Sequence, residues 1–238
     1  MEVLKCQIIK LLSLPKKNNF WILLGLTCSF LGLIIGVSNF NYQNTDSLIL
    51  KNGDLLFQDL DSSPLCDAIE KVTSGFDNLN FSHVGIITII ENEKYVLEAF
   101  SNGVDTVHLS HFLNRNLNSN NKPKVIVGRL HEEYSKLIPK AVQKGMSLIG
   151  KGYDEEFKIN NNRFYCSELI YDIFLDANNN NPFFYLHPMT YKYNGETLDT
   201  WLEYFKKLDI PIPENEPGIN PGGISLSKKL TIIHNYMD

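Results

Sequence analysis

The amino-acid sequence predicts a single α+β domain, residues 48–238, that follows an apolar N-terminal segment. The chain has 238 residues, a length that fits one ordinary domain. Short strand-like runs fill most of its first half, and segments with helical spacing dominate its second half. Hydrophobic residues make up 43% and charged residues 21%, which is typical of a globular protein and excludes wholesale disorder.

The predicted elements alternate between strand and helix, with most strands early and the longer helices late. The strand candidates are 48–50 with 53–57, His83–Ile90, 95–100, 104–109, 124–130 and 230–233. The helix candidates are Pro64–Val72, 110–117, 134–150, 166–175 and 197–208. Polar residues 91–94 predict a turn that makes a hairpin of the second and third strands, and the Pro- and Gly-containing stretch 211–223 predicts a wrapping loop.

The N-terminal segment predicts a membrane anchor. Residues 20–37 carry no charge, and a helix of 18 residues reaches about 27 Å, close to the thickness of a bilayer core. All four lysines of this region precede it, so the positive-inside rule places residues 1–19 in the cytosol and the domain outside. We therefore divide the chain into a cytosolic segment 1–19, a transmembrane segment 20–38, a linker 39–47 and the domain 48–238. A cleaved signal peptide, which would leave a secreted or periplasmic protein, and a buried core helix are the alternatives.

The net charge bears on the binding partners of the protein, and the cysteine content bears on its disulfides. The formal net charge is −5, so we expect no nucleic-acid partner. Of the four cysteines, only Cys66 and Cys166 fall in the domain, too few for a disulfide scaffold, although a bridge between these two stays open.

Cys166 has the sequence position of a thiol nucleophile. Such a thiol needs a base and an electropositive site, and a helix N-terminus supplies the second through its unpaired N–H groups. Cys166 opens the predicted helix 166–175. The alternative is a buried, inert cysteine that packs as a small hydrophobe. The neighbouring Ser167 has no nucleophile-elbow motif around it.

His83 is the candidate base, with Glu98 as its partner. Among six histidines, His83 alone heads a long apolar strand immediately after a serine. Glu98 lies fifteen residues later in the neighbouring strand, where its carboxylate could orient the imidazole. A solvent-facing Glu98 is the simpler alternative.

We expect no metal ion or cofactor. The sequence lacks the CxxC, HExxH, GxxxxGK[ST] and GxGxxG motifs of zinc, P-loop and dinucleotide sites. Residues 176–180 begin like a calcium loop, but Asn181 and His187 stand where that loop needs Gly and Glu.

Five motifs, in order, resemble one family of enzymes. They are GDLLFQ, FSHVGI, YVLEAF, GKGYDEEF and YCSELIYDIF, followed by a PGG-containing tail. In this order they resemble the YiiX-like family, the circularly permuted branch of the NlpC-type papain-like cysteine peptidases and amidases, over residues 48–238. The resemblance implies a permuted papain-like fold in which an antiparallel sheet packs on helices and the strands with His and its partner precede the Cys helix.

The resemblance also implies roles for particular residues. The nucleophile falls on Cys166, the base on His83 and the orienting residue on Glu98, while Tyr165 becomes a candidate for stabilising the oxyanion. Asp54, Tyr153 and Asp154 match motif positions for which structural and functional roles are equally open.

The resulting hypothesis is a thiol-dependent hydrolase that cleaves amide bonds, by resemblance those of cell-wall (peptidoglycan) peptides. One rival is an acyl-lipid hydrolase or acyltransferase of the lecithin:retinol acyltransferase type, whose members share the permuted fold. The other is a membrane-tethered binding module without catalysis. The expected partners are accordingly a peptide or acyl-lipid substrate, and a membrane through the N-terminal helix.

Overall fold

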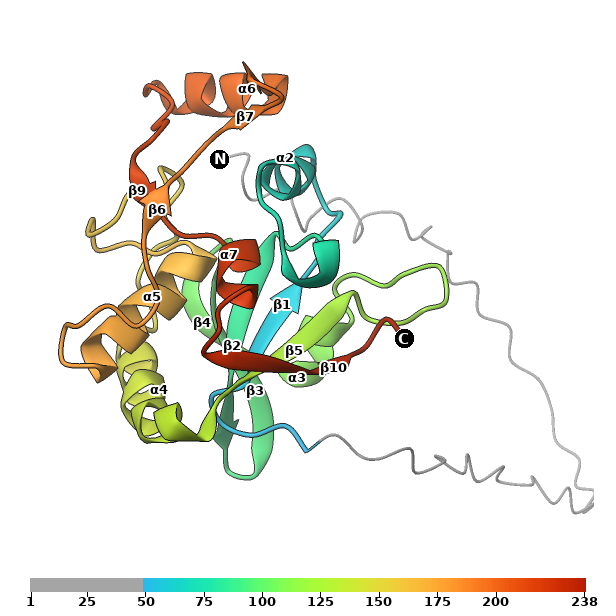
Figure 1. The fold of residues 1–238 in the computed structure, drawn as a ribbon, viewed down its shortest axis with the longest axis vertical. Coiled ribbons are helices and arrows are strands. Elements are labelled where there is room, and N and C mark those ends of the chain that lie inside the picture. Colours follow the sequence, from blue (N-terminus) through green and yellow to red (C-terminus); the bar gives the residue numbers. More distant parts are fainter. Residues whose placement is uncertain (1–48) are drawn as a thin grey trace, which may run out of the picture.

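The computed structural model describes residues 49–238, which fold around one antiparallel sheet (Figure 1). Its six strands lie in the order β10-β5-β1-β2-β3-β4, and each neighbouring pair is antiparallel. The strands are β1 Leu55–Gln58, β2 His83–Ile90, β3 Glu93–Phe100, β4 Gly103–His108, β5 Val125–Leu130 and β10 Leu230–Asn235. The predicted antiparallel sheet packed on helices is therefore confirmed.

Helices cover the sheet and extend beyond one end of it (Figure 1). They are α2 Pro64–Val72, α3 Leu109–Leu113, α4 Ile138–Ser147, α5 Cys166–Ala177, α6 Asp199–Leu208 and α7 Pro221–Ser225, with single 3-10 turns at η1 Phe76–Asn78 and η2 Glu132–Leu137. Two small two-stranded sheets complete the fold: β6 His187–Pro188 with β9 Pro217–Gly218, and β7 Lys192–Tyr193 with β8 Glu196–Thr197.

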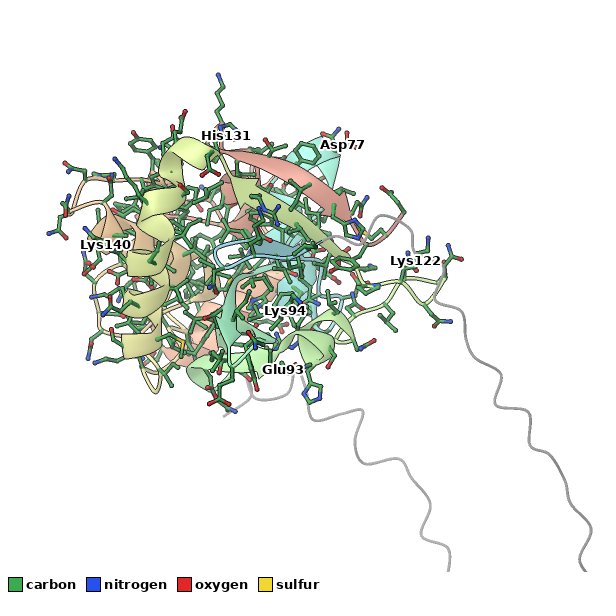
Figure 2. All side chains as sticks on the ribbon, turned by 90° about the horizontal axis from the view of Figure 1, so that it is seen from below. Asp77, Glu93, Lys94, Lys122, His131 and Lys140 are labelled. Atoms are coloured by element: carbon green, nitrogen blue, oxygen red, sulfur yellow. The ribbon has the colours of Figure 1, made fainter. Side chains whose placement is uncertain are left out.

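Both faces of the central sheet are buried. Alternate residues of a strand point to opposite faces, so each strand contributes to two cores. Leu55 and Phe57 of β1 pack in the larger core, together with Leu169 and other residues of α5. Leu56, between them, packs in a smaller core with Phe112 of α3. The strands therefore carry nearly continuous apolar runs. Charged side chains such as Lys140 on α4 and Lys122 in the loop before β5 point outward (Figure 2).

Most predicted elements form, and the differences have local causes. The turn between β2 and β3 needs only Glu91 and Asn92, because both adopt positive φ (49° and 67°) and make a tight hairpin, so Glu93 and Lys94 join the strand. The helix predicted over 134–150 is split into the 3-10 segment and α4, since Pro139, which has no N–H to donate, is favoured in the first turn of a helix and is the second residue of α4.

Three other boundaries were predicted wrongly. Ile49 and Leu50 precede the first strand instead of belonging to it. The helix predicted over 110–117 ends at Leu113, and the loop predicted over 211–223 contains β9 and the start of α7. Asn220 starts α7 because its side chain accepts a hydrogen bond from the Gly223 N–H, at 2.7 Å.

The predicted anchor, residues 20–38, lies outside the described residues, as do the flanking segments 1–19 and 39–47. Within residues 49–238, every helix is too short or too polar to cross a membrane.

The edge strand β4 is tied to the loop that leads toward Cys166. Val104 donates its N–H to the Lys151 carbonyl at 2.8 Å, and Gly150 donates its N–H to the Val104 carbonyl at 2.9 Å. Gly103 sits in this joint with φ +107°, and a Cβ added there would collide with the backbone oxygen of Lys151. Gly150 has φ +88° but open space around it.

We expect Gly103→Ala to destabilise the protein far more than Gly150→Ala. Both substitutions force a Cβ into the left-handed region, at a cost of about 1–2 kcal/mol. Only Gly103→Ala adds the collision with Lys151, which costs about 1–3 kcal/mol more. Urea denaturation of the two variants measures this difference in the free energy of unfolding. Equal losses of stability in the two variants would show that the backbone around Gly103 and Lys151 adjusts to the added Cβ without loss of free energy.

Candidate active site

Cys166 is the first residue of α5, and its thiol lies at the end of the sheet where β2 begins. Its side chain is buried, and its Sγ lies 3.9 Å from the carbonyl oxygen of Ser82, the residue before β2. The N–H groups of the first turn of a helix have no partner within the helix. Together with the helix dipole, they favour negative charge at this position, either on a thiolate or on an oxyanion.

His83, the first residue of β2, is held between Cys166 and Glu98. Its Nε2 lies 2.6 Å from Oε2 of Glu98, so Nδ1 is the ring nitrogen left for the thiol. The ring is 2% exposed and packs against Phe100 and Phe112, with centroid distances of 5.0 and 5.8 Å. Burial alone would lower the pKa of His83, but hydrogen bonds to Cys166 and Glu98 raise that pKa to about 9. These two hydrogen bonds therefore favour the protonated imidazole.

Glu98 is buried in β3 and keeps its charge because of two cationic partners. Arg115 donates from Nη1 to Oε2 at 2.7 Å and from Nη2 to Oε1, so the guanidinium grips both carboxylate oxygens. Burial would raise the pKa of Glu98, but the hydrogen bonds from Arg115 and His83 outweigh it and lower that pKa below its ordinary value. The alternative of a solvent-facing Glu98 was wrong, since this residue is only 4% exposed.

Arg115 is the residue of this cluster that sequence analysis missed. It follows α3 and lies over the rings of Phe100 and Phe112, at 4.4 and 5.2 Å from their centroids. A signal was present, because the chain has only three arginines and many more lysines. Each arginine pairs with a carboxylate, as Arg129 does with Asp54 and Arg163 with Glu156. The planar, two-pronged guanidinium suits such pairs better than lysine does.

Gln58 is a second missed residue, at the end of the GDLLFQ motif. It lies directly opposite His83 in the β1–β2 register and is fully buried. Its Nε2 donates to the carbonyl of Phe112 at 2.8 Å. Gln58 thereby ties α3, and with it the Phe112 ring against His83, to the central strand.

The cluster draws on both faces of the sheet. His83 and Glu98 alternate with residues of the larger core and share the face of Ile87 and Val96, which α3 covers. Cys166 comes from α5, which packs on the opposite face. The thiol and the imidazole therefore meet around the end of β2.

The residues on either side of Cys166 hold one backbone segment between them. The Tyr165 hydroxyl accepts a hydrogen bond from the Ile219 N–H at 3.2 Å, and the Ser167 hydroxyl donates to the Ile219 carbonyl at 2.8 Å. Both side chains are buried. Tyr165 keeps its own proton for donation, whereas the Ser167 proton is already engaged, which argues against Ser167 as the nucleophile.

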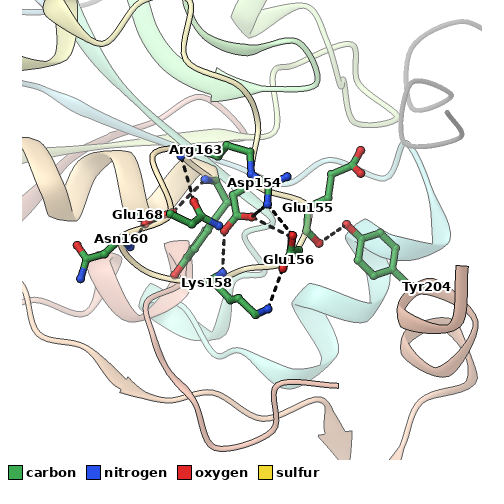
Figure 3. Close-up of polar contacts among 10 residues, drawn as sticks. Asp154, Glu155, Glu156, Lys158, Asn160, Arg163, Glu168 and Tyr204 are labelled. Atoms are coloured by element: carbon green, nitrogen blue, oxygen red, sulfur yellow. Dashed lines mark hydrogen bonds and ion pairs between the residues drawn. The ribbon is translucent and has the colours of Figure 1, made fainter. Parts of the chain in front are cut away.

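The motif residues Asp54 and Asp154 are engaged in structural contacts. Asp54 is 1% exposed and accepts two hydrogen bonds from Arg129, both at 2.7 Å. Asp154 is fully buried and accepts the N–H groups of Glu156 and Lys158, which folds the loop before α5 around it (Figure 3). Tyr153 instead lines the cavity beside Cys166.

Glu168 joins the same loop to the start of α5. Its carboxylate accepts the N–H of Asn160 at 3.3 Å and that of Tyr165 at 3.4 Å (Figure 3). Burial and the nearby Asp154 raise the pKa of Glu168 to about 8. This carboxyl group fixes Tyr165, the residue that precedes Cys166.

One acidic cluster of the described part has the donor atoms of a metal site. Oxygens of Asp59, Asp61 and Glu70 lie within 4.8 Å of one another. Lys124 already binds this cluster, with its Nζ 3.1 Å from Asp59 Oδ2 and in contact with Asp61 Oδ2. A metal ion would have to displace that ammonium, so these residues do not fit a bound ion as they stand.

Cys66 and Cys166, the cysteines of the described part, form no disulfide. Cys66 packs at the start of α2, where the Ser63 hydroxyl lies 3.5 Å from its sulfur. The bridge that the sequence left open is therefore absent here.

Comparison with known proteins shows the family to which the chain belongs. Residues 49–234 match the model of a family described as permuted papain-like amidase enzymes, YaeF/YiiX, C92 family. The chain is 28% identical to YiiX of Escherichia coli strain K12 over 148 residues. These residues make up 62% of this chain and 65% of that protein, so the chain spans less than two thirds of its relative's length.

A solved structure shares the fold. It is that of YiiX from Escherichia coli O157:H7, described as a metalloprotein, with a TM-score of 0.65 and 22% sequence identity. The match covers 78% of this chain and 97% of that one. With a family match over most of its length and this fold, the chain belongs to the C92 family of permuted papain-like amidases.

Proposed function

We propose that this protein hydrolyses amide bonds through a Cys166 thiolate paired with protonated His83, with Glu98 as the orienting carboxylate. The observation that carries the proposal is the buried His83, which lies between the Cys166 thiol and a carboxylate fixed by Arg115. A protonated, desolvated imidazole beside a thiol at a helix N-terminus favours the ion pair that a cysteine nucleophile needs. Membership of an amidase family supports the reaction class.

In the first half of the reaction, the thiolate attacks the amide carbonyl and forms the C–S bond. N–H groups of the first turn of α5 hold the resulting oxyanion, and we place the Tyr165 hydroxyl as a further donor. His83 gives its proton to the departing nitrogen as the C–N bond breaks. The products of this half are an amine and a thioester on Cys166.

In the second half, water releases the acyl group. Neutral His83 takes a proton from the water, whose oxygen forms a bond with the thioester carbon. The C–S bond then breaks, and the thiolate and the protonated imidazole are restored. Glu98 holds the ring so that Nδ1 faces the thiol in both halves.

The metal of the E. coli structure does not enter this mechanism. Of the described residues, the Asp59, Asp61 and Glu70 cluster offers suitable oxygens, but Lys124 is already bound to Asp59 and Asp61. Every step proposed here uses side chains and backbone groups of the chain itself.

Two classes of amide substrate are candidates for this reaction. The family resemblance implies an amide of a cell-wall peptide. A second candidate, an amide of a long acyl chain, is favoured by one observation: a cavity of about 450 Å³ beside Cys166 that is lined mainly by apolar and aromatic side chains.

We expect Cys166 to react with iodoacetamide at pH 6–7, far below the range of a free thiol, whose pKa is ~8.5. His83→Ala should remove this low-pH reactivity, and mass spectrometry of the labelled protein measures it. Cys66 is the internal control, because it lies apart from His83. A Cys166 that needs alkaline pH in both proteins would exclude the ion pair.

We expect hydrolysis to decline as the pH rises through about 9, because His83, whose pKa is about 9, then loses the proton that the departing nitrogen needs. The pH dependence of kcat/KM in wild type measures this limb.

Cys166→Ala should abolish hydrolysis and leave the unfolding transition intact. Activity that persists in Cys166→Ala would end the proposal.

Arg115→Met should lower kcat/KM by roughly tenfold to a hundredfold. Removal of this cation raises the pKa of Glu98 and favours the protonated imidazole of His83, because a positive charge near both groups is lost. The alkaline limb of the pH profile should therefore move to higher pH. Glu98→Gln should move the limb in the opposite direction, to lower pH, because it removes the carboxylate that raises the pKa of His83.

Arg129→Met is the matched control, because it also breaks an arginine pair with a buried carboxylate, Asp54, but one outside the cluster. Both Arg→Met variants should lose stability, and only Arg115→Met should shift the pH limb. An unshifted limb in Arg115→Met would reduce Arg115 to a structural role.

A further inference from the structure

We propose that Glu70 and Ser82 are positioning residues for the pair formed by Cys166 and His83. The Glu70 carboxyl group, through the Ser82 hydroxyl, fixes the backbone where β2 begins, and this backbone faces the thiol and carries the imidazole. The inference rests on the proposed hydrolysis at Cys166 and deepens it, because it adds two residues on which the reactivity of the thiol depends.

Ser82 lies next to both reacting groups. It directly precedes His83, the first residue of β2, and its carbonyl oxygen lies 3.9 Å from the Cys166 sulfur. A displacement of Ser82 therefore changes both the position of the imidazole and the surroundings of the thiol. Ser82 is only 6% exposed, so its polar groups need partners within the protein.

The hydroxyl of Ser82 makes two hydrogen bonds. It donates to Oε1 of Glu70 at 2.7 Å and accepts the N–H of Leu60 at 2.9 Å. The N–H of Ser82 donates to the carbonyl of Gln58 at 3.1 Å. The paired register of β1 and β2 ends at Gln58 and His83. The Ser82 side chain therefore attaches the start of β2 to α2 and to the segment after β1, beyond the last paired residues.

Glu70 is a well-fixed acceptor for this hydroxyl. It lies in α2 and is buried, and its carboxyl group is within 4.8 Å of those of Asp59 and Asp61. Lys124 pairs with these two aspartates. Burial raises the pKa of Glu70 to about 7, and the hydrogen bond from Ser82 acts against that rise. A carboxyl group accepts a hydrogen bond in its neutral and in its ionised form, so the contact with Ser82 does not require the charge.

A positioning role and a merely structural role have different consequences for the thiol. Loss of a structural contact lowers the free energy of unfolding and leaves the chemistry of the folded site unchanged. Loss of a positioning contact changes the reactivity of Cys166 in the folded protein, because the sulfur and the imidazole no longer meet at the same distance. The reactivity of Cys166 therefore distinguishes the two roles.

The test measures the rate at which iodoacetamide alkylates Cys166 in the purified full chain between about pH 5 and pH 10, by mass spectrometry. Ser82→Ala removes the hydroxyl and keeps the carbonyl. We expect its rate at about pH 6.5 to fall roughly tenfold from that of wild type, since a misplacement of reacting groups by about 1 Å costs up to roughly a hundredfold in rate. The unfolding transition of each variant shows that folded protein is labelled.

Ser225→Ala is the matched control. The Ser225 hydroxyl likewise accepts an N–H, that of Phe76 at 2.9 Å, and donates to an oxygen, the carbonyl of Gly222 at 2.6 Å. Ser225 is also buried, at 2% exposure. The two variants thus lose equivalent hydrogen bonds, and Ser225→Ala should keep the alkylation rate of Cys166 within about twofold of wild type.

Two substitutions of Glu70 separate its hydrogen bond from its charge. Glu70→Gln keeps an oxygen that accepts from Ser82, and its alkylation rate should stay within about threefold of wild type. Glu70→Leu removes the acceptor and should lower the rate about as much as Ser82→Ala does. The double variant of Glu70→Leu and Ser82→Ala should be no slower than Ser82→Ala alone, because both changes break the same contact.

Hydrolysis of the 7-amino-4-methylcoumarin amides of L-alanine and of dodecanoic acid separates this inference from the proposed function. Alkylation at low pH that falls in Ser82→Ala, with neither amide hydrolysed by wild type, would overturn hydrolysis of these two amide classes and keep the inference. Equal alkylation in wild type, Ser82→Ala and Glu70→Leu, or equal losses in Ser82→Ala and Ser225→Ala, would overturn the inference and leave the hydrolase standing. A wild-type Cys166 that reacts only at alkaline pH would overturn both.

Discussion

The site depends on a buried row of charges that runs from Arg115 through Glu98 to His83 and the Cys166 thiol. Neighbouring members favour each other's charged forms. Hydrogen bonds from Arg115 and His83 lower the pKa of Glu98, and hydrogen bonds to Cys166 and Glu98 raise the pKa of His83. Arg115 also stacks on Phe100 and Phe112, the two rings that enclose the imidazole. The contacts of Arg115 therefore affect both the pKa of Glu98 and the position of the two rings that enclose the His83 imidazole.

This row explains why α3, a helix of five residues, matters to the site. Phe112 belongs to α3 and Arg115 follows it, and Gln58 of the central strand holds the helix through the Phe112 carbonyl. On the other face of the sheet, α5 brings the thiol and the loop before it. Asp154 and Glu168 fix that loop through backbone N–H groups. The sheet thus separates the cluster that holds His83 from the helix that carries Cys166, and the end of β2 is where they meet.

Sequence alone predicted Cys166, His83 and Glu98 as candidates because each has a recognisable place in an element: the first residue of a helix, the first residue of an apolar strand, and a polar residue within a neighbouring apolar strand. The structure brings these three together. Arg115 was missed because it lies in an Asn-rich loop with no periodicity. Its pairing depends on how that loop returns to β3, and no local pattern encodes that return. Gln58 reads as an ordinary strand end until the β1–β2 register places it opposite His83.

The cavity was harder still to foresee, since its lining residues come from segments far apart in the sequence. Short strands such as β6 and β9 carry no signal of their own, because two residues cannot show alternation, and tertiary contacts decide where they form. Helix α4 was predicted more closely than these short strands. Its helical periodicity was evident, but the position of Pro139 decided where the α-helix could start.

The hydrogen bonds from Tyr165 and Ser167 to Ile219 have a consequence for the order in which the site is assembled. During synthesis, His83, Glu98 and Arg115 leave the ribosome first, Cys166 follows, and Ile219 emerges later. β10, which adds the sheet edge next to β5, emerges later still. The segment around Cys166 therefore lacks this support until Ile219 has been made. A chain that stops before Ile219 would lack the hydrogen bonds that hold Tyr165 and Ser167, the residues on either side of Cys166.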